Sequence, residues 1–71
     1  MNAAHERVLV YFEYSHLPED LQRISKPIGE LAYQMADELQ NSTDGAEVTV
    51  GLRKLLEAKD AFVRAALKRV P

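Results

Sequence analysis

Two stretches of the chain place apolar residues three or four positions apart, the spacing that lines one face of an α-helix. The first holds Leu21, Ile24, Ile28, Leu31, Met35 and Leu39, and the second holds Val48, Leu52, Leu55, Leu56, Phe62, Val63, Ala66, Leu67 and Val70. Between them lies the polar segment Gln40-Asn41-Ser42-Thr43-Asp44-Gly45, which is typical of a turn. Two helices joined by so short a turn predict an antiparallel helical hairpin.

The starts of both helices carry capping signals. Pro18 suits the first position of a helix, and the two acidic residues after it favour the positive end of the helix dipole. Asp44 followed by Glu47 is the pattern of a capping box. The β-branched run Val48-Thr49-Val50 and the following Gly51 weaken the first turns of that helix.

The segment from Ala3 to Ser15 is ambiguous, because Val8-Leu9-Val10-Tyr11-Phe12 suits either a strand or a buried helix. We predict a helix, since no second strand of similar quality is present to pair with it. One face of this helix would hold Ala4, Val8, Tyr11, Phe12 and Ser15. The predicted fold is therefore all-α, a single domain over residues 1–71 in which a short N-terminal helix packs on the hairpin.

Composition limits both the class of protein and its partners. The 71 residues are 46% hydrophobic and 28% charged, which is typical of a globular domain, and no apolar run is long enough for a membrane span. The absence of cysteine excludes disulfides, cysteine-ligated zinc and thiol nucleophiles, so we expect a cytosolic protein. A net charge of −2 argues against binding to long nucleic acid. Three short helices make a thin core, which favours oligomerisation.

The two parts of the chain differ in charge. Residues 1–45 carry three basic and eight acidic side chains, whereas residues 46–71 carry six basic and three acidic ones. Opposite charges of this kind suit association, either of helices within one chain or of one copy with another.

The sequence offers little for catalysis. His5 and His16 lack the spacing of paired metal ligands on a helix, and we expect both to be partly exposed near helix ends. No serine lies in a nucleophile-elbow motif, and no glycine-rich phosphate loop is present. We therefore predict neither an enzyme nor a cofactor.

Pro27 interrupts the first apolar series and predicts a kink in the helix near Lys26. If the helix restarts at Pro27, the free amides of Ile28, Gly29 and Glu30 would lie near the Lys26 ammonium and form a site for an anion such as phosphate. The alternative is a bend that only curves the hairpin and leaves Lys26 in solvent.

Aromatic and basic side chains are the other candidates for ligand binding. Phe12 is expected in the core, whereas Tyr11 suits either core packing or stacking on a nucleobase. The basic residues of the last helix are Arg53, Lys54, Lys59, Arg64, Lys68 and Arg69. We expect most of them on an exposed face supported by pairs such as Asp60–Arg64, with Arg64 itself partly shielded by its apolar neighbours.

Three pieces of the sequence resemble the phage-encoded anti-CBASS cyclic-oligonucleotide sponges, which act against a bacterial immune system that signals infection with cyclic nucleotides. The pieces are Tyr11, the stretch His16-Leu17-Pro18-Glu19-Asp20-Leu21-Gln22-Arg23-Ile24-Ser25-Lys26-Pro27, and the stretch Glu57-Ala58-Lys59-Asp60-Ala61-Phe62-Val63-Arg64. A related hairpin occurs in the anti-Thoeris sponge. The chain differs from the family in a shorter loop around residues 40–46.

The resemblance implies a small helical protein with a kinked helix that assembles as a homohexamer in the host bacterial cytoplasm. It implies sequestration, without cleavage, of cyclic dinucleotides such as cyclic GMP-AMP between protomers and of cyclic trinucleotides at separate sites. By the same resemblance, Tyr11 stacks on a base, Lys26 contacts phosphate and Arg64 serves the trinucleotide site. Two alternatives remain open: a helical module that docks on another protein, and an enzyme that degrades the same messengers.

Overall fold

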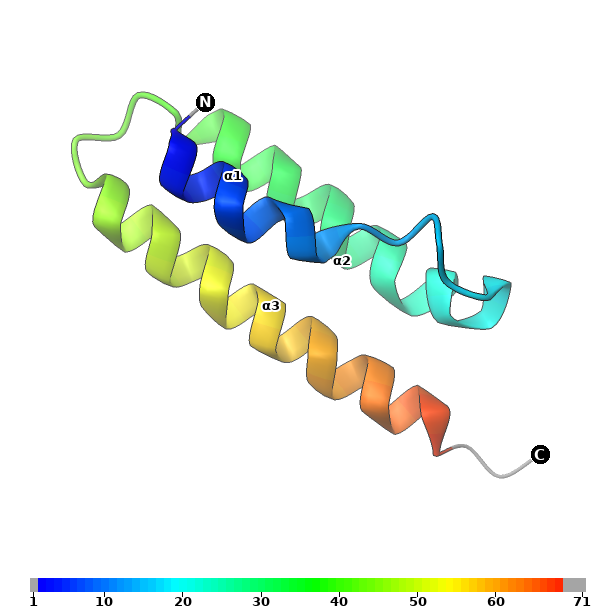
Figure 1. The fold of residues 1–71 in the computed structure, drawn as a ribbon. Coiled ribbons are helices and arrows are strands. Elements are labelled where there is room, and N and C mark those ends of the chain that lie inside the picture. The colour runs from blue at the N-terminus through cyan, green and yellow to red at the C-terminus, as the bar shows by residue number, and fades with distance from the viewer. Residues whose placement is uncertain (1, 69–71) are drawn as a thin grey trace.

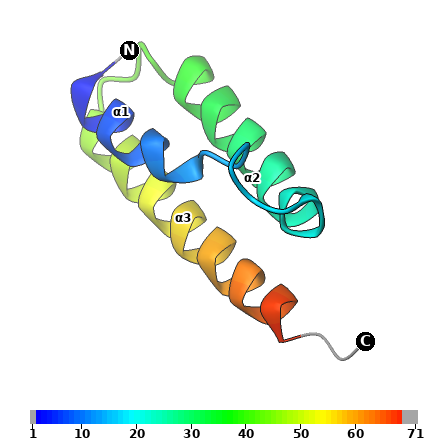
Figure 2. The same cartoon turned by 45° about the vertical axis from the view of Figure 1, so that its right-hand side comes forward.

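The computed structural model describes residues 2–68 and is all-helical, with no strand in that range. Helix α1 (Ala3–Leu9) continues into a 3-10 turn, η1 (Val10–Phe12), and is followed by α2 (Glu19–Glu38) and α3 (Gly45–Leu67). Figure 1 shows α2 and α3 as an antiparallel hairpin, and α1 contacts both of its helices. Figure 2 shows that α1 covers the half of the hairpin nearest the 40–44 turn, whereas the other half is open. The prediction of an all-α fold with an N-terminal helix against a hairpin is confirmed, while Arg69 and Val70 lie outside the described residues.

The N-terminal helix is shorter than predicted. Its helical turns end at Phe12, and Ser15 therefore lies in the connection to α2 rather than on a helix face. The Glu13 carboxylate accepts hydrogen bonds from the backbone amides of Tyr14 and Ser15, each at 2.9 Å, and from the Ser15 hydroxyl at 2.8 Å. Such local bonds compete with the helical pattern, which explains why the helix stops there.

These bonds also lower the pKa of Glu13, through the Ser15 amide first, then the Ser15 hydroxyl and the Tyr14 amide. Above the pKa that the Glu13 carboxyl has in the unfolded chain, these bonds stabilise the turn fully. As the pH falls through the lowered pKa of Glu13 in the folded chain, this stabilisation is lost. We expect Ser15→Ala to raise the pKa of Glu13, measured by NMR titration of its side-chain carboxyl carbon. Ser42→Ala, in the other turn, should leave it unchanged, and an equal response to both variants would contradict this account.

The capping residues lie nearly where predicted, but only half of the capping box forms, because the Asp44 amide donates to the Ser42 hydroxyl at 3.0 Å and not to the Glu47 side chain. Pro18 precedes α2 as its N-cap instead of occupying the first helical position. The Asp44 carboxylate accepts a hydrogen bond from the Glu47 amide at 3.1 Å, which confirms Asp44 as the N-cap of α3. The turns over Val48–Gly51, which the sequence predicts to be weak, are helical, because Val48 packs against the hydrophobic core.

The core lies where α1 and η1 cover the hairpin. Its buried apolar residues are Val8, Leu9, Phe12, Leu21, Ala32, Ala36 and Leu52. Phe12 is buried as predicted, and the chain passes close to α2 at Gly29, where an added Cβ would lie 2.9 Å from the Phe12 carbonyl oxygen. Two alanines among so few core residues leave little apolar volume to hold the fold together.

His5 differs from its prediction, because only 2% of its surface is exposed. Its Nε2–H donates to the Gly45 carbonyl oxygen at 3.1 Å and so ties α1 to the first turn of α3. Its Nδ1 atom is buried and has no hydrogen-bond partner among the described residues. His16 is exposed, as predicted. His5 is therefore part of the packing between helices and not a free side chain near a helix end.

Candidate functional site

Tyr11 lies in η1 with 66% of its surface exposed, and it lines a cleft of about 340 Å³ between α1 and α3. The cleft is lined by Ala4, Arg7, Val8, Tyr11, Thr49, Arg53 and Leu56. We refer to it as the Tyr11 cleft. Arg7 and Tyr11 are four positions apart along α1 and η1, and Thr49 and Arg53 are four apart along α3, which places each pair on one helix face.

The Tyr11 cleft carries two cations that are free to bind a ligand. Neither Arg7 nor Arg53 forms an ion pair or a side-chain hydrogen bond with any residue from 2 to 68. Guanidinium groups bind carboxylates and phosphates through two parallel hydrogen bonds, and they also stack on flat rings. An exposed aromatic side chain in the same cleft as two such groups suits a ligand with both a flat ring and a negative charge.

Lys59 fixes the backbone at Tyr11. Its Nζ donates to the Tyr11 carbonyl oxygen at 3.0 Å and pairs with the Asp60 carboxylate at 2.9 Å, and its side chain is only 12% exposed. The predicted Asp60–Arg64 pair is therefore wrong, because Asp60 pairs with the adjacent lysine. Most of the basic residues of this helix were expected on an exposed face, and Lys59 is an exception. The missed signal is its position four residues after Leu55, in register with the apolar series.

The structure does not bring the three predicted ligand-binding residues together within one chain. Lys26 is exposed on α2, and it lines neither the Tyr11 cleft nor the cavities between α2 and α3. Arg64 is also exposed on α3 and lines none of them, so its predicted shielding is wrong. Tyr11 and Lys26 therefore line no common cavity within one chain.

Helix α2 passes through Pro27 as a single helix, so it does not restart there. The amides of residues 28–30 consequently do not form a helix N-terminus beside Lys26. The kink near Lys26 stays a prediction, and the proposed contact of Lys26 with phosphate rests on its exposed ammonium alone.

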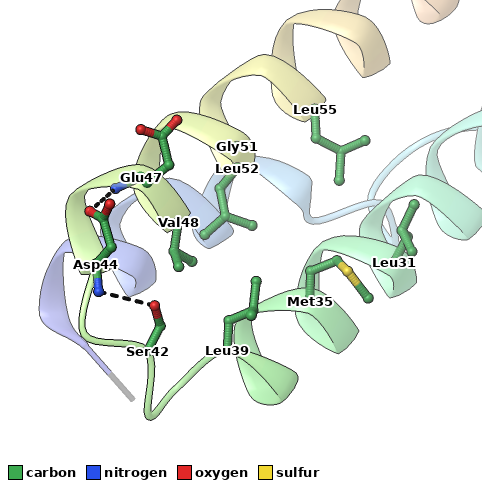
Figure 3. A pocket seen from close by; sticks show the side chains of 10 residues that line it. All are labelled: Leu31, Met35, Leu39, Ser42, Asp44, Glu47, Val48, Gly51, Leu52 and Leu55. Carbon is green, nitrogen blue, oxygen red and sulfur yellow. Dashed lines mark hydrogen bonds between the residues drawn. The ribbon is translucent and has the colours of Figure 1, made fainter.

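A larger cavity of about 520 Å³ lies between α2 and α3 near the 40–44 turn. Figure 3 shows side chains of both helices pointing into it, with α1 behind them. Its lining residues are Leu31, Met35, Leu39, Ser42, Asp44, Glu47, Val48, Gly51, Leu52 and Leu55. This apolar groove, as we call it from here on, has few polar groups and no basic side chain, so it does not suit a phosphate-bearing ligand.

The described residues contain no cluster of three or more histidine and carboxylate side chains that could hold a metal ion. Between residues 2 and 68, no helix is both long and apolar enough to cross a membrane. Comparisons of the chain with protein families, with curated proteins and with solved structures find no match.

Proposed function

We propose that the protein binds cyclic di- and trinucleotides and sequesters them without cleavage, so that CBASS effectors of an infected bacterium are not activated. The observation that supports this function most directly is the Tyr11 cleft, where an exposed aromatic side chain lies with two unpaired guanidinium groups. A cyclic dinucleotide offers two flat bases and two phosphodiester groups on a rigid ring. The cleft provides the matching surfaces for one base and one phosphate.

The expected contributions follow from this chemistry. Stacking of a base on an aromatic side chain contributes about 1–3 kcal/mol per base. Charge-assisted hydrogen bonds from Arg7 or Arg53 to phosphate add affinity and orientation. Sequestration needs no general acid, general base or bound metal, because no bond in the ligand is broken.

We propose that the complete dinucleotide site forms between copies, in a homohexamer. Tyr11 lines the Tyr11 cleft between α1 and α3, whereas Lys26 is on the exposed surface of α2, outside this cleft. A symmetric pair of chains would present each group twice, which matches the two bases and two phosphates of the ligand. Arg64 would serve cyclic trinucleotides at a separate site.

The deciding experiment measures binding and the fate of the ligand together. Purified protein is titrated with cyclic GMP-AMP and, separately, cyclic triadenylate by calorimetry, and the complex is then heat-denatured and its nucleotide analysed by chromatography. Saturable binding with intact nucleotide recovered is the expected result. Altered nucleotide would indicate an enzyme, and the absence of binding to either ligand would overturn the proposal.

We expect Tyr11→Ala, Lys26→Ala and Arg53→Gln each to raise the dissociation constant for cyclic GMP-AMP by about tenfold or more, because each removes a stacking surface or a cation. The oligomeric state, measured by light scattering, should not change. Tyr33→Ala is the matched control, because Tyr33 is also an exposed tyrosine but does not line the Tyr11 cleft. Equal weakening by the control, or collapse of the assembly, would assign these residues a structural role.

The second candidate function is a helical module that docks on another protein without a nucleotide ligand. The apolar groove favours it, because a surface of this kind usually covers an apolar side chain of a partner. The calorimetric experiment separates the two functions, since the docking module would bind no cyclic nucleotide.

A further inference from the structure

The hairpin has one long face that α1 does not cover. Gly51, which lines the apolar groove, is two residues from both Thr49 and Arg53, which face α1, so it lies nearly on the opposite side of α3. Toward the open end of the hairpin, the cavity next to Phe62 is lined by Arg23, Ile24, Pro27, Ile28, Phe62, Ala65 and Ala66. We call the surface formed by this cavity and the apolar groove the hairpin face.

The hairpin face carries a projecting group at one end and a hollow at the other. Phe62 has 58% of its surface exposed, although it belongs to the apolar series of α3. The hollow is the apolar groove of about 520 Å³, which nothing in the described chain fills. At Gly51 an added Cβ would have no atom within 4 Å, so the groove is open directly above this residue.

The charges at the two ends of the hairpin face are opposite. Asp44 and Glu47 line the end near the turn, and Arg23 lines the end near Phe62. None of these three side chains forms an ion pair within the part of the chain that the structure describes. Because a two-fold axis places the same surface of both copies face to face in opposite directions, the acidic end of one copy would meet the basic end of the other.

We propose that the hairpin face docks on a second copy of this chain about a two-fold axis, with Phe62 of each copy entering the apolar groove of the other. Phe62 and Gly51 are separated by about 16 Å along α3, at about 1.5 Å per residue, so the axis crosses the helix midway between them, at the level of residues 56 and 57. The small side chains along this stretch, Gly51, Ala58 and Ala65, let the two α3 helices approach closely.

The available area suits a stable pair. The molecule measures 47 Å by 18 Å by 16 Å, so one long face is close to the roughly 800 Å² that each partner buries in a specific interface. Covering it would also remove from water the exposed side chains of Leu31, Leu39 and Phe62, which the thin core of one chain leaves uncovered. A second copy therefore completes both the shape and the apolar contacts of the hairpin face.

This inference rests on the self-association in the proposed function but not on nucleotide binding, so the two are tested separately. Sedimentation velocity over a range of concentrations measures association without ligand. We expect the native chain to associate, and Phe62→Lys and Gly51→Leu each to raise the dissociation constant of the pair at least tenfold. Gly51→Leu has free space for its side chain and a higher helix propensity, so it keeps the protomer folded while filling the groove.

Leu67→Lys is the matched control, because Leu67 is a similarly exposed apolar residue of α3, with 66% of its surface accessible, at a helix angle about 140° from Phe62. The Leu67→Lys variant should associate with the same dissociation constant as the native chain. Circular dichroism confirms that each variant is folded. A native chain that stays monomeric, association unchanged by both hairpin-face variants, or equal loss in the control would overturn the proposal.

A charge exchange tests the orientation of the pair. We expect Arg23→Glu and Glu47→Arg each to weaken association several-fold and the double variant to regain most of it, because the two side chains meet across the axis. Failure of the double variant to recover would overturn the antiparallel arrangement. An associating chain that binds no cyclic nucleotide would leave this interface standing and overturn the proposed function alone.

Discussion

Replacement of His5 by alanine should lower the free energy of unfolding by about 2–4 kcal/mol, a large part of the stability of so small a domain. The variant leaves a cavity at a buried position and removes one of the two side-chain hydrogen bonds that the Gly45 carbonyl accepts, the other being from the Thr49 hydroxyl. The contact joins α1 to the start of α3, so its loss should also loosen the N-terminal helix. Urea unfolding measures the stability, and amide hydrogen exchange of residues 4–9 measures the loosening.

His16→Ala is the control, since His16 is exposed in the connection before α2. Its effect should stay within about 0.5 kcal/mol, as expected of a surface substitution. Similar destabilisation by the two variants, or unchanged exchange in α1 of the His5 variant, would contradict the assigned role of His5 as a link between helices.

Gly29→Ala should destabilise the fold by about 2 kcal/mol, although alanine is the better helix former. The new methyl group would lie 2.9 Å from the Phe12 carbonyl oxygen and 3.4 Å from the Tyr14 ring. The first neighbour is backbone, which cannot rotate away, so α2 and η1 would have to separate. Thermal and urea unfolding, at a concentration where the chain is monomeric, measure the loss.

Gly51→Ala is the matched control on the other helix of the hairpin. Its added methyl group meets no atom within 4 Å, so only the gain in helix propensity remains, up to about 1 kcal/mol of added stability. The two variants are the same chemical change in the same kind of helix, and we expect opposite signs. Stabilisation by Gly29→Ala would show that the close approach at Phe12 is absent.

The hairpin was predictable because its signals are local. The apolar series in residues 21–39 and 48–67 has the period of a helix wherever the helix packs. The Asp44 carboxylate caps α3 by accepting a hydrogen bond from the Glu47 amide, only three residues later. Phe12 was also predictable as a core residue. The end of the first helix was missed, because the turn at Glu13 depends on side-chain bonds that compete with an apolar run otherwise suited to a longer helix.

The candidate site was predictable only in part. The sequence singled out Tyr11 as a residue that suits base stacking, and its exposure fits that use. It did not indicate Arg7 and Arg53 as its neighbours, because they are 46 positions apart in the sequence and meet only where α1 packs on α3. The contact of Lys59 with the Tyr11 carbonyl was missed for the same reason, since that carbonyl belongs to another element.

The sequence by itself determined the all-helical class, the hairpin and its turn, since period, caps and turn residues act over a few neighbouring positions. Only the tertiary structure decided that His5 is buried, that Gly29 must be small, that two arginines line the same cleft as Tyr11, and that Phe62 is left outside the core. Each of these depends on which distant surfaces meet, and that choice is made by the packing of α1 against one face of the hairpin.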